Sequence, residues 1–385
     1  MQRLQNSIQH YAWGSTTAIP SLLNEPPTGE PWAELWMGAH PRAPSRVTIE
    51  TAEIDLNDAL RRDPDNLLGR EVRERFGDEL PFLLKILAAA HPLSLQAHPS
   101  QEQARLGFAA ENVAKIPLSH EKRNYKDAHH KPELICALSP FVALCGFRPW
   151  AQSLELIDQL RVDSLRQLAK QGLRSVLSHV MQADLASRRA LSQALVHACA
   201  VRPVKAFQNE CACIVKIGTD FPDDAGVVAA LLLNWVRLEP GEALFLPAGN
   251  LHAYVQGVGI EIMANSDNVL RGGLTPKHVD VGELMKVLSF QDAAPTILRP
   301  RGAPEAIYET PAREFRLSMI DVIGPAISVL RPRAPDILWV ASGEVTIKTK
   351  TSLVLRQGES IFVGASEGAL HFEGRGRVFR ATVGR

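Results

Sequence analysis

The chain has 385 residues and carries 42 basic and 42 acidic side chains, so its formal net charge is zero. A balanced charge leaves no electrostatic footprint for nucleic acid or an anionic membrane surface, and no apolar run reaches transmembrane length. The five cysteines are scattered and odd in number, which is typical of reduced thiols in a cytoplasmic protein. The length predicts two or three domains.

Two strands are predicted in the first ninety residues. Residues 33–38 form a candidate strand with Glu34 and Trp36 on one face. Residues 80–90 form an apolar strand with a single charge, Lys85. Because an unpaired buried ammonium is costly, we expect Lys85 to reach a cavity or a partner; a snorkelling or salt-bridged lysine is the alternative.

The next stretch carries the first metal-ligand candidates. Gln96 and His98 would project to the same face of a strand, where an amide oxygen and an imidazole could touch one metal ion. Ser100 is predicted to cap a helix over 101–114, with Gln103 as its capping-box partner.

A third candidate ligand follows a proline. Pro132 ends any helix, and Glu133 begins an apolar strand. By strand alternation Lys131 and Glu133 share a face, whereas His130 points elsewhere or belongs to the preceding loop.

The character of the chain changes between residues 150 and 229. Leucine and valine recur there at helical spacing, which predicts a helical insertion with His179 and His197 on its surface. Cys211 and Cys213 have no second cysteine pair, which argues against a zinc site in this region.

Residues 241–252 hold the most informative pattern: Gly, five residues, Pro, one residue, Gly, two residues, His. The pattern predicts a short strand, a tight turn and a second strand beginning near His252. A histidine at the mouth of a small β structure can reach a metal while the strand holds its backbone. An ordinary hairpin with a surface histidine is the alternative.

The following strand, 259–265, places Glu261 and Asn265 on one face. Arg271 precedes two glycines, so we expect a cation where an open backbone lets a ligand approach closely. A structural salt bridge is the alternative for Arg271.

The last hundred residues are again β-patterned. Residues 357–366 repeat the glycine-then-strand rhythm of 241–249, but Gly364 stands at the proline position and Ala369 at the position of His252. We interpret this region as a degenerate second copy of the barrel without a metal.

Gln96, His98, Glu133 and His252 are therefore the best candidates for a single site. Two imidazoles, a carboxylate and an amide oxygen suit zinc in a catalytic role, with a position open to water or substrate. Iron and manganese fit the same set.

The motifs resemble known families. The 241–252 spacing resembles the second metal motif of cupin β-barrels, with Gln256 where that motif usually has Asn. Over essentially the whole chain, five stretches look like type I mannose-6-phosphate isomerases, in that family's order. These stretches are residues 9–14, 93–100, 125–133, 246–254 and 261–277.

The resemblance implies a mainly β fold of two cupin-type (jelly-roll) β-barrels plus an α-helical domain. The implied parts are a catalytic barrel (1–100 with 115–149 and 230–292), a helical insertion (150–229) and a metal-free C-terminal barrel (293–385). It further implies a zinc enzyme that interconverts mannose 6-phosphate and fructose 6-phosphate. The family's zinc ligands fall on the four candidate residues, with one ion per chain, and its active-site arginine falls on Arg271.

The resemblance also guides the expected roles. Lys131 and Lys277 would supply cations near the phosphate or sugar, and Glu261, His98 and His130 are rival proton shuttles. The expected catalytic residues are Arg271, Lys131, Glu261 and His130. The expected substrate-binding residues are Lys85, Ser100, Lys277, Asn265 and Trp13.

We expect a sugar phosphate as the only partner of a cytoplasmic monomer, without nucleic acid or membrane. Another metal-dependent cupin enzyme, such as an oxygenase or an iron-dependent sugar isomerase, is the alternative among enzymes. A non-catalytic sugar-binding cupin is the alternative outside them.

Overall fold

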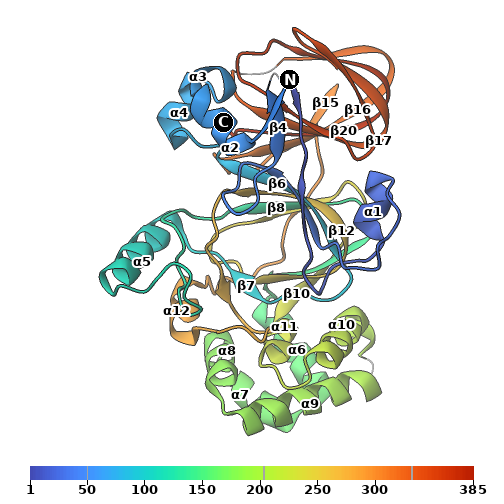
Figure 1. Cartoon of the computed structure of the whole chain (residues 1–385). Helices are drawn as coiled ribbons and strands as arrows, with labels where there is room; N and C mark the ends of the chain where they lie inside the picture. Colours follow the sequence, from blue (N-terminus) through green and yellow to red (C-terminus); the bar gives the residue numbers. More distant parts are fainter. Residues whose placement is uncertain (50, 203, 331–332) are drawn as a thin grey trace.

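A computed structural model describes residues 1–49, 51–202, 204–330 and 333–385. In Figure 1 three parts follow one another along the long direction of the molecule: helices at the bottom, a central β structure, and a second β structure at the top. This strand-rich architecture with a helical region confirms the predicted fold class. No helix in the described ranges is both long enough and apolar enough to cross a lipid bilayer.

Antiparallel pairing joins the strands of the central sheet. Within the described residues the 11 strands are β2 (Ser7–Gln9), β3 (Glu34–Gly38), β6 (Phe82–Ala89), β7 (Gln96–Ala97), β8 (Glu133–Ala137), β9 (Phe141–Phe147), β10 (Leu233–Leu238), β11 (Ala243–Leu246), β12 (His252–Ala264), β13 (Leu270–Arg271) and β14 (Ile297–Leu298).

The long strand β12 connects the two sides of this sheet. Its first half pairs with β7 and β9, and its second half pairs with β6 and β8. Between the halves the register against β9 shifts, and Gly257 has a φ of 124°. A Cβ on Gly257 would lie 2.8 Å from the Cα of Phe141, so only glycine fits this bend. One strand therefore carries both His252 and Glu261 to the interior.

The predicted helical insertion is present, and His179 and His197 lie at least partly exposed on it, as expected. Its elements are α6 (Trp150–Leu160), α7 (Asp163–Ala169), α8 (Leu173–Gln182), α9 (Leu185–Val201), the 3-10 turn Lys205–Phe207, α10 (Gln208–Asp220) and α11 (Gly226–Leu231). Its buried leucines share one apolar core with barrel residues such as Leu95 and Leu251. The insertion is thus packed firmly on the barrel.

The C-terminal sheet also contains the start of the chain. Its strands are β1 (Gln2–Arg3), β15 (Glu305–Tyr308), β16 (Arg316–Val329), β17 (Asp336–Lys348), β18 (Ser352–Arg356), β19 (Ser360–Val363) and β20 (Leu370–Thr382). Strand β1 lies at the edge of this sheet, where it pairs antiparallel with β19. The Met1 amino group holds β1 there, 2.9 Å from Glu367 Oε1.

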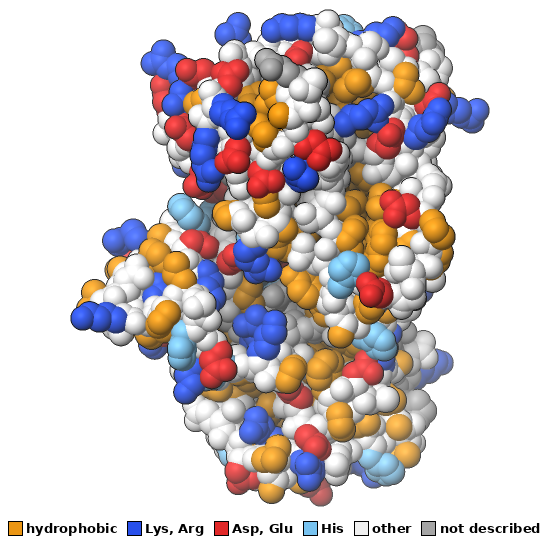
Figure 2. Space-filling view, in the orientation of Figure 1, with side chains coloured by type: hydrophobic (Ala, Val, Ile, Leu, Met, Phe, Trp, Pro, Cys, Tyr) orange, Lys and Arg blue, Asp and Glu red, His pale blue; other side chains and the backbone are white. Residues whose placement is uncertain are grey.

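The remaining elements are α1 (Ala18–Leu23), β4 (Arg46–Ile49), β5 (Ala52–Asp55), α2 (Leu56–Arg62), α3 (Pro64–Leu67), α4 (Arg70–Phe76), α5 (Gln101–Val113) and α12 (Val281–Val287). Helix α5 begins with the predicted capping box: Ser100 Oγ accepts from Gln103 N at 3.2 Å, and Gln103 Oε1 accepts from Ser100 N at 2.9 Å. Figure 2 shows basic and acidic side chains interspersed over one face of the molecule.

Candidate active site

Three of the four predicted metal ligands meet in the interior of the central barrel. His252 begins β12, Glu133 begins β8, and His98 follows the end of β7. His98 Nε2 lies 3.3 Å from Glu133 Oε1, and His252 Nε2 lies 3.3 Å from Glu133 Oε2. One ligand atom from each residue falls within 4.8 Å of the others, and all three residues are buried. Side chains that are far apart in sequence are thus brought to one point.

The hydrogen bonds of the two imidazoles direct their free nitrogens to this point. His98 Nδ1 lies 2.7 Å from the carbonyl oxygen of Asn268, and His252 Nδ1 lies 3.0 Å from that of Asn250. A carbonyl can only accept, so each Nδ1 carries the proton and each Nε2 keeps a lone pair.

Those lone pairs have no protein donor. Among the described residues, no hydrogen bond of good geometry reaches His98 Nε2, His252 Nε2 or Glu133 Oε2, although all three atoms are buried. At the 3.3 Å approaches to Glu133 two acceptors face each other, because neither Nε2 carries a proton to donate. Buried acceptors without donors are costly, and a divalent cation bound by two imidazoles and a carboxylate would satisfy them. The residues fit a zinc ion.

The protonation states suit a metal as well. Burial lowers the pKa of His98 to about 4, so its imidazole is neutral near pH 7. Burial alone would raise the pKa of Glu133, but the nearby Lys131 ammonium outweighs it and brings the pKa well below its usual range. Lys131 Nζ lies 3.0 Å from Glu133 Oε1. Neutral imidazoles and an ionised carboxylate are the forms that bind metal.

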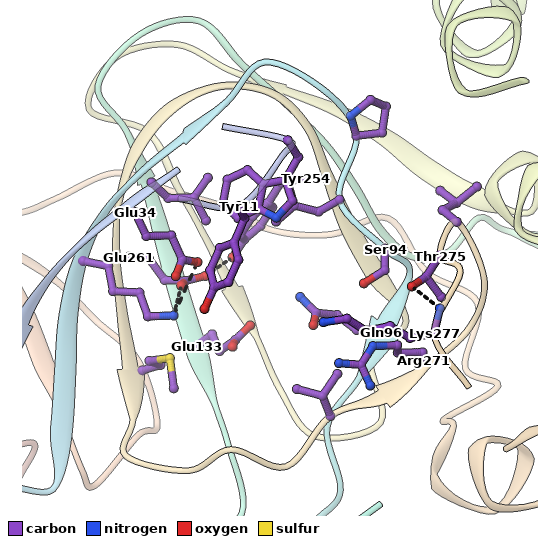
Figure 3. A pocket seen from close by; sticks show the side chains of 18 of the residues that line it. Tyr11, Glu34, Ser94, Gln96, Glu133, Tyr254, Glu261, Arg271, Thr275 and Lys277 are labelled. Carbon is purple, nitrogen blue, oxygen red and sulfur yellow. Dashed lines mark hydrogen bonds and ion pairs between the residues drawn. The ribbon is translucent and has the colours of Figure 1, made fainter. Parts of the chain in front are cut away.

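Gln96, the fourth predicted ligand, lies on the adjacent wall. It pairs opposite His252 on one side and Arg271 on the other, and Figure 3 shows the Gln96 and Arg271 side chains next to each other. Strand β7 ends at Ala97, so the prediction that His98 shares a strand with Gln96 is wrong. Pro99, which has no N–H for a ladder, follows directly.

A cavity of about 720 Å³ opens beside this centre. It has two chemically different ends in Figure 3, with Glu34, Glu261 and Tyr11 at one and Arg271, Thr275 and Lys277 at the other. The site residues that line it are Trp13, Lys85, Gln96, Lys131, Glu133, Glu261, Arg271 and Lys277.

The first end is built around a buried lysine. Lys85 Nζ lies 3.6 Å from Glu34 Oε1 and 3.4 Å from Glu261 Oε2. Lys85 thus faces the cavity, as predicted, and also forms the salt bridges that were the alternative. Burial opposes its charge, but the two carboxylates outweigh burial and raise the pKa of Lys85. Burial raises the pKa of Glu261, and Lys85 opposes that rise. Tyr254 donates its hydroxyl proton to Glu261 Oε1 at 2.8 Å.

The second end carries unneutralised positive charge. No hydrogen bond or ion pair is found for the Arg271 guanidinium within the part of the chain that the structure describes, and burial lowers its pKa. Burial, together with the charges of Arg271 and Arg42, also lowers the pKa of Lys277. The hydroxyl residues Ser94 and Thr275 lie on the same wall. Unpaired cations beside hydroxyls suit a phosphate.

The two glycines after Arg271 allow close packing on the side away from the cavity. A Cβ on Gly273 would lie 2.7 Å from the Cα of Gly226, at the start of α11, and the φ of Gly273 is 112°. A Cβ on Gly272 would lie 3.0 Å from Leu251. The glycines therefore let the helical insertion approach the barrel behind Arg271.

Three predicted site residues lie outside the cavity. His130 Nε2 contacts Glu314 Oε1 of the C-terminal region at 2.8 Å, in a separate hollow that Asn265 also lines. Ser100 caps α5. Trp13, by contrast, lines the cavity and stacks on Tyr11 with ring centroids 5.7 Å apart.

No sequence pattern singled out Asn268, Tyr254, Ser94 or Thr275 for a function. Asn268 is fully buried. Its side-chain amide nitrogen donates to the main-chain carbonyls of Asp127 at 2.9 Å and His129 at 2.8 Å, and its main-chain carbonyl accepts from His98. The polar run that contains Asn268 was a usable signal. Single hydroxyl residues in loops carry no such signal.

Fold and site together define a cupin-type metalloenzyme whose metal centre opens on a polar cavity. Residues 1–150 match the catalytic domain of type I phosphomannose isomerase. The chain is 41% identical over 399 residues to mannose-6-phosphate isomerase of Salmonella typhimurium, and 39% identical over 398 residues to that of Escherichia coli. In both pairs the match covers 99% of each protein.

Solved structures agree with these relatives. The Salmonella typhimurium enzyme bound to its substrate and a zinc atom matches with a TM-score of 0.93 at 39% identity, over the whole of both chains. A zinc-bound mannose 6-phosphate isomerase matches with a TM-score of 0.92 at 38% identity, over 100% of this chain and 99% of the other. The chain belongs to the type I phosphomannose isomerase family, which confirms the resemblance seen in the sequence.

Proposed function

We propose that this chain interconverts mannose 6-phosphate and fructose 6-phosphate, with one zinc ion held by Gln96, His98, Glu133 and His252. The observation that carries the proposal is the set of buried, unpartnered ligand atoms beside a cavity with a cationic end and an acid–base end. Bound there, zinc would supply a Lewis acid for a sugar oxygen.

The cationic end orients the substrate. Lys277, with the hydroxyls of Ser94 and Thr275, binds the 6-phosphate. Arg271 lies between this group and Gln96, so its guanidinium offsets negative charge on the sugar oxygens as the enediolate forms. Trp13, stacked on Tyr11, presents an apolar ring to the sugar.

Glu261 carries the proton between C2 and C1. It is buried, lines the cavity, and has a raised pKa, which suits a general base near neutral pH. His98 directs its lone pair at the metal site, and His130 lies outside the cavity. Glu261 removes the C2 proton of mannose 6-phosphate to give the enediolate, then returns a proton to C1. Lys131 serves the concurrent shift of a hydroxyl proton from O2 to O1.

The residues outside the cavity hold its walls. Ser100, two positions after His98, caps the start of α5. His130, directly before Lys131, contacts Glu314. Asn265 follows the end of β12, where its backbone N–H donates to Pro81 at 3.0 Å. We assign these three residues supporting roles.

The same proposal includes a cytoplasmic monomer. The five cysteines, all buried and free as in a reducing compartment, support the cytoplasmic location.

A coupled assay tests the reaction. We expect conversion of mannose 6-phosphate to fructose 6-phosphate that is lost after chelation and restored by one equivalent of zinc per chain. Binding of the sugar phosphate without turnover by the zinc-loaded protein would contradict the proposal and point to a sugar-binding cupin.

A further inference from the structure

Glu34 has no role in the reaction proposed above, yet it lies within the acid–base end of the cavity. It comes from β3, Lys85 from β6 and Glu261 from β12, three strands that neighbour one another in the central sheet. The three side chains are only 9%, 8% and 4% exposed. Their charges therefore act on one another with little screening by water.

Glu34 is held in a fixed orientation. Trp36 Nε1 donates to Glu34 Oε2 at 2.6 Å, which leaves Oε1 directed at Lys85, 3.6 Å away. The Lys85 ammonium also lies 5.0 Å from the centre of the Trp36 ring. Figure 3 shows the Glu34 and Glu261 carboxylates on the same side of the cavity. Lys85 is thus shared between two carboxylates and not paired with one.

This sharing matters for a general base. A buried carboxylate paired exclusively with one ammonium is held ionised and engaged, and it accepts a proton poorly. With two carboxylates around one ammonium, the trio of Glu34, Lys85 and Glu261 keeps one negative charge in excess. That surplus favours proton uptake by one of the carboxylates.

We propose that Glu34 is a positioning residue for proton transfer: it draws Lys85 away from an exclusive pair with Glu261 and so leaves Glu261 free to accept and return the substrate proton. This inference rests on the proposed role of Glu261. Glu34 itself is tied to Trp36 and Lys85, so it acts through them and not on the substrate.

The charges around Glu261 give the direction of the effect. Burial raises the pKa of Glu261 most, the negative charges of Glu133 and Glu34 raise it further, and Lys85 and Lys131 lower it. Removing the charge of Glu34 must therefore lower this pKa. The groups facing Glu261 are Lys85 from β6, Glu34 from β3, Glu133 from β8, Lys131 from the preceding loop and Tyr254 from β12 itself.

The test is the pH profile of kcat/KM for Glu34→Gln, whose amide oxygen can still accept from Trp36. The midpoint of the acid limb reports the essential base of the free enzyme. We expect it to fall by about one pH unit, with kcat at the plateau reduced about tenfold and KM little changed. Unchanged zinc content and thermal midpoint would show that the variant is folded. A profile that superimposes on the wild type would overturn the inference.

Trp36→Phe is the matched control. It removes the N–H that orients Glu34 but keeps the Glu34 charge, so its acid limb should shift in the same direction by clearly less than that of Glu34→Gln. A shift as large as that of Glu34→Gln would assign the effect to general disturbance of the wall and overturn the proposal. Glu34→Asp moves the charge away by one methylene and should shift the acid limb in the same direction by less. It replaces Glu34→Gln as the test variant if Glu34→Gln does not fold.

Glu261→Gln separates the proposed proton carrier from the proposed positioning residue. Loss of turnover in this variant supports the proton carrier. If Glu261→Gln is inactive while Glu34→Gln keeps the wild-type profile, only the inference about Glu34 fails. If Glu261→Gln keeps wild-type turnover, the proton carrier itself is misassigned.

Discussion

The central and C-terminal barrels contain the same strand–turn–strand unit, but only the central one builds a metal site among the described residues. In the central barrel β11 leads through the turn to His252 at the start of β12; in the C-terminal barrel β19 leads to Ala369, just before β20. The interiors differ. Two buried charges of the C-terminal barrel, Arg380 and Asp336, pair with each other at 3.1 Å. Beside them lies a buried hydrophobic cluster: Ile320, Val322, Val329, Leu338, Val340, Val345, Ile347, Leu355, Ile361, Val363, Leu370, Phe372 and Val378.

The difference shows that a metal site needs ligands from several strands and hydrogen bonds that orient them. His252 is useful because Glu133 and His98 come from other strands to meet it, and because carbonyls hold both Nδ1 atoms. None of these partners has a counterpart in the apolar cluster. The C-terminal barrel instead supplies a rigid core, and Glu314 between its strands β15 and β16 contacts His130.

The largest effect should come from making the central barrel resemble the C-terminal one. His252→Ala is expected to abolish zinc binding and to reduce turnover by more than about a hundredfold, beyond the range for groups that only support a ligand. Zinc content by mass spectrometry and the coupled assay measure both. The reciprocal variant Ala369→His should gain no zinc. Zinc retention by His252→Ala would break the comparison.

Arg271→Ala should have the next largest effect. The guanidinium has no protein partner among the described residues and lies beside Gln96, so its charge is available to the developing enediolate. We expect kcat to fall about 10²–10³-fold, with zinc content unchanged. Steady-state kinetics check this. An effect confined to KM would instead place Arg271 with Lys277 at the phosphate.

Asn268→Asp should weaken zinc binding without removing a ligand. The substitution replaces the amide N–H donors by a carboxylate oxygen that would face the Asp127 and His129 carbonyls. The two carbonyls lose their hydrogen bonds, so the segment leading to Lys131 and Glu133 should shift. We expect zinc affinity, measured by chelator competition, to fall about 10–100-fold. Asn66→Asp, an exposed asparagine of α3, is the control and should keep the wild-type affinity.

The smallest effect on chemistry should come from the C-terminal core. Phe372→Ala removes a fully buried ring and should lower the free energy of unfolding by about 3–5 kcal/mol. Denaturant titration measures this loss. Turnover per zinc-loaded chain should stay at the wild-type value, and a parallel loss of zinc affinity would show that the two barrels are coupled.

The sequence predicted those parts of the site that depend on local patterns. The turn before His252 and the capping box at Ser100 are short-range features, and the structure has both. Lys131 does contact Glu133 at 3.0 Å, but it precedes β8, so strand alternation is not what brings the two side chains together. The lysine in the apolar strand β6 likewise predicted a cavity or a partner, because an unpaired buried charge is costly.

Long-range relations were not predictable in the same way. Nothing local indicates that β1 joins the C-terminal sheet, or that Gly273 faces Gly226. Glu34 lies near Lys85 and Glu261 because β3, β6 and β12 are consecutive in the sheet, and this order depends on pairing between segments that are distant in sequence. The proton carrier became assignable only once the cavity wall was known.

Anomalous diffraction at the zinc edge from crystals of the zinc-loaded protein tests the central claim most directly. We predict one peak per chain, about 2.0–2.2 Å from His98 Nε2, His252 Nε2 and a carboxylate oxygen of Glu133. A peak elsewhere in the molecule, or none among these three side chains, would contradict the proposed metal centre.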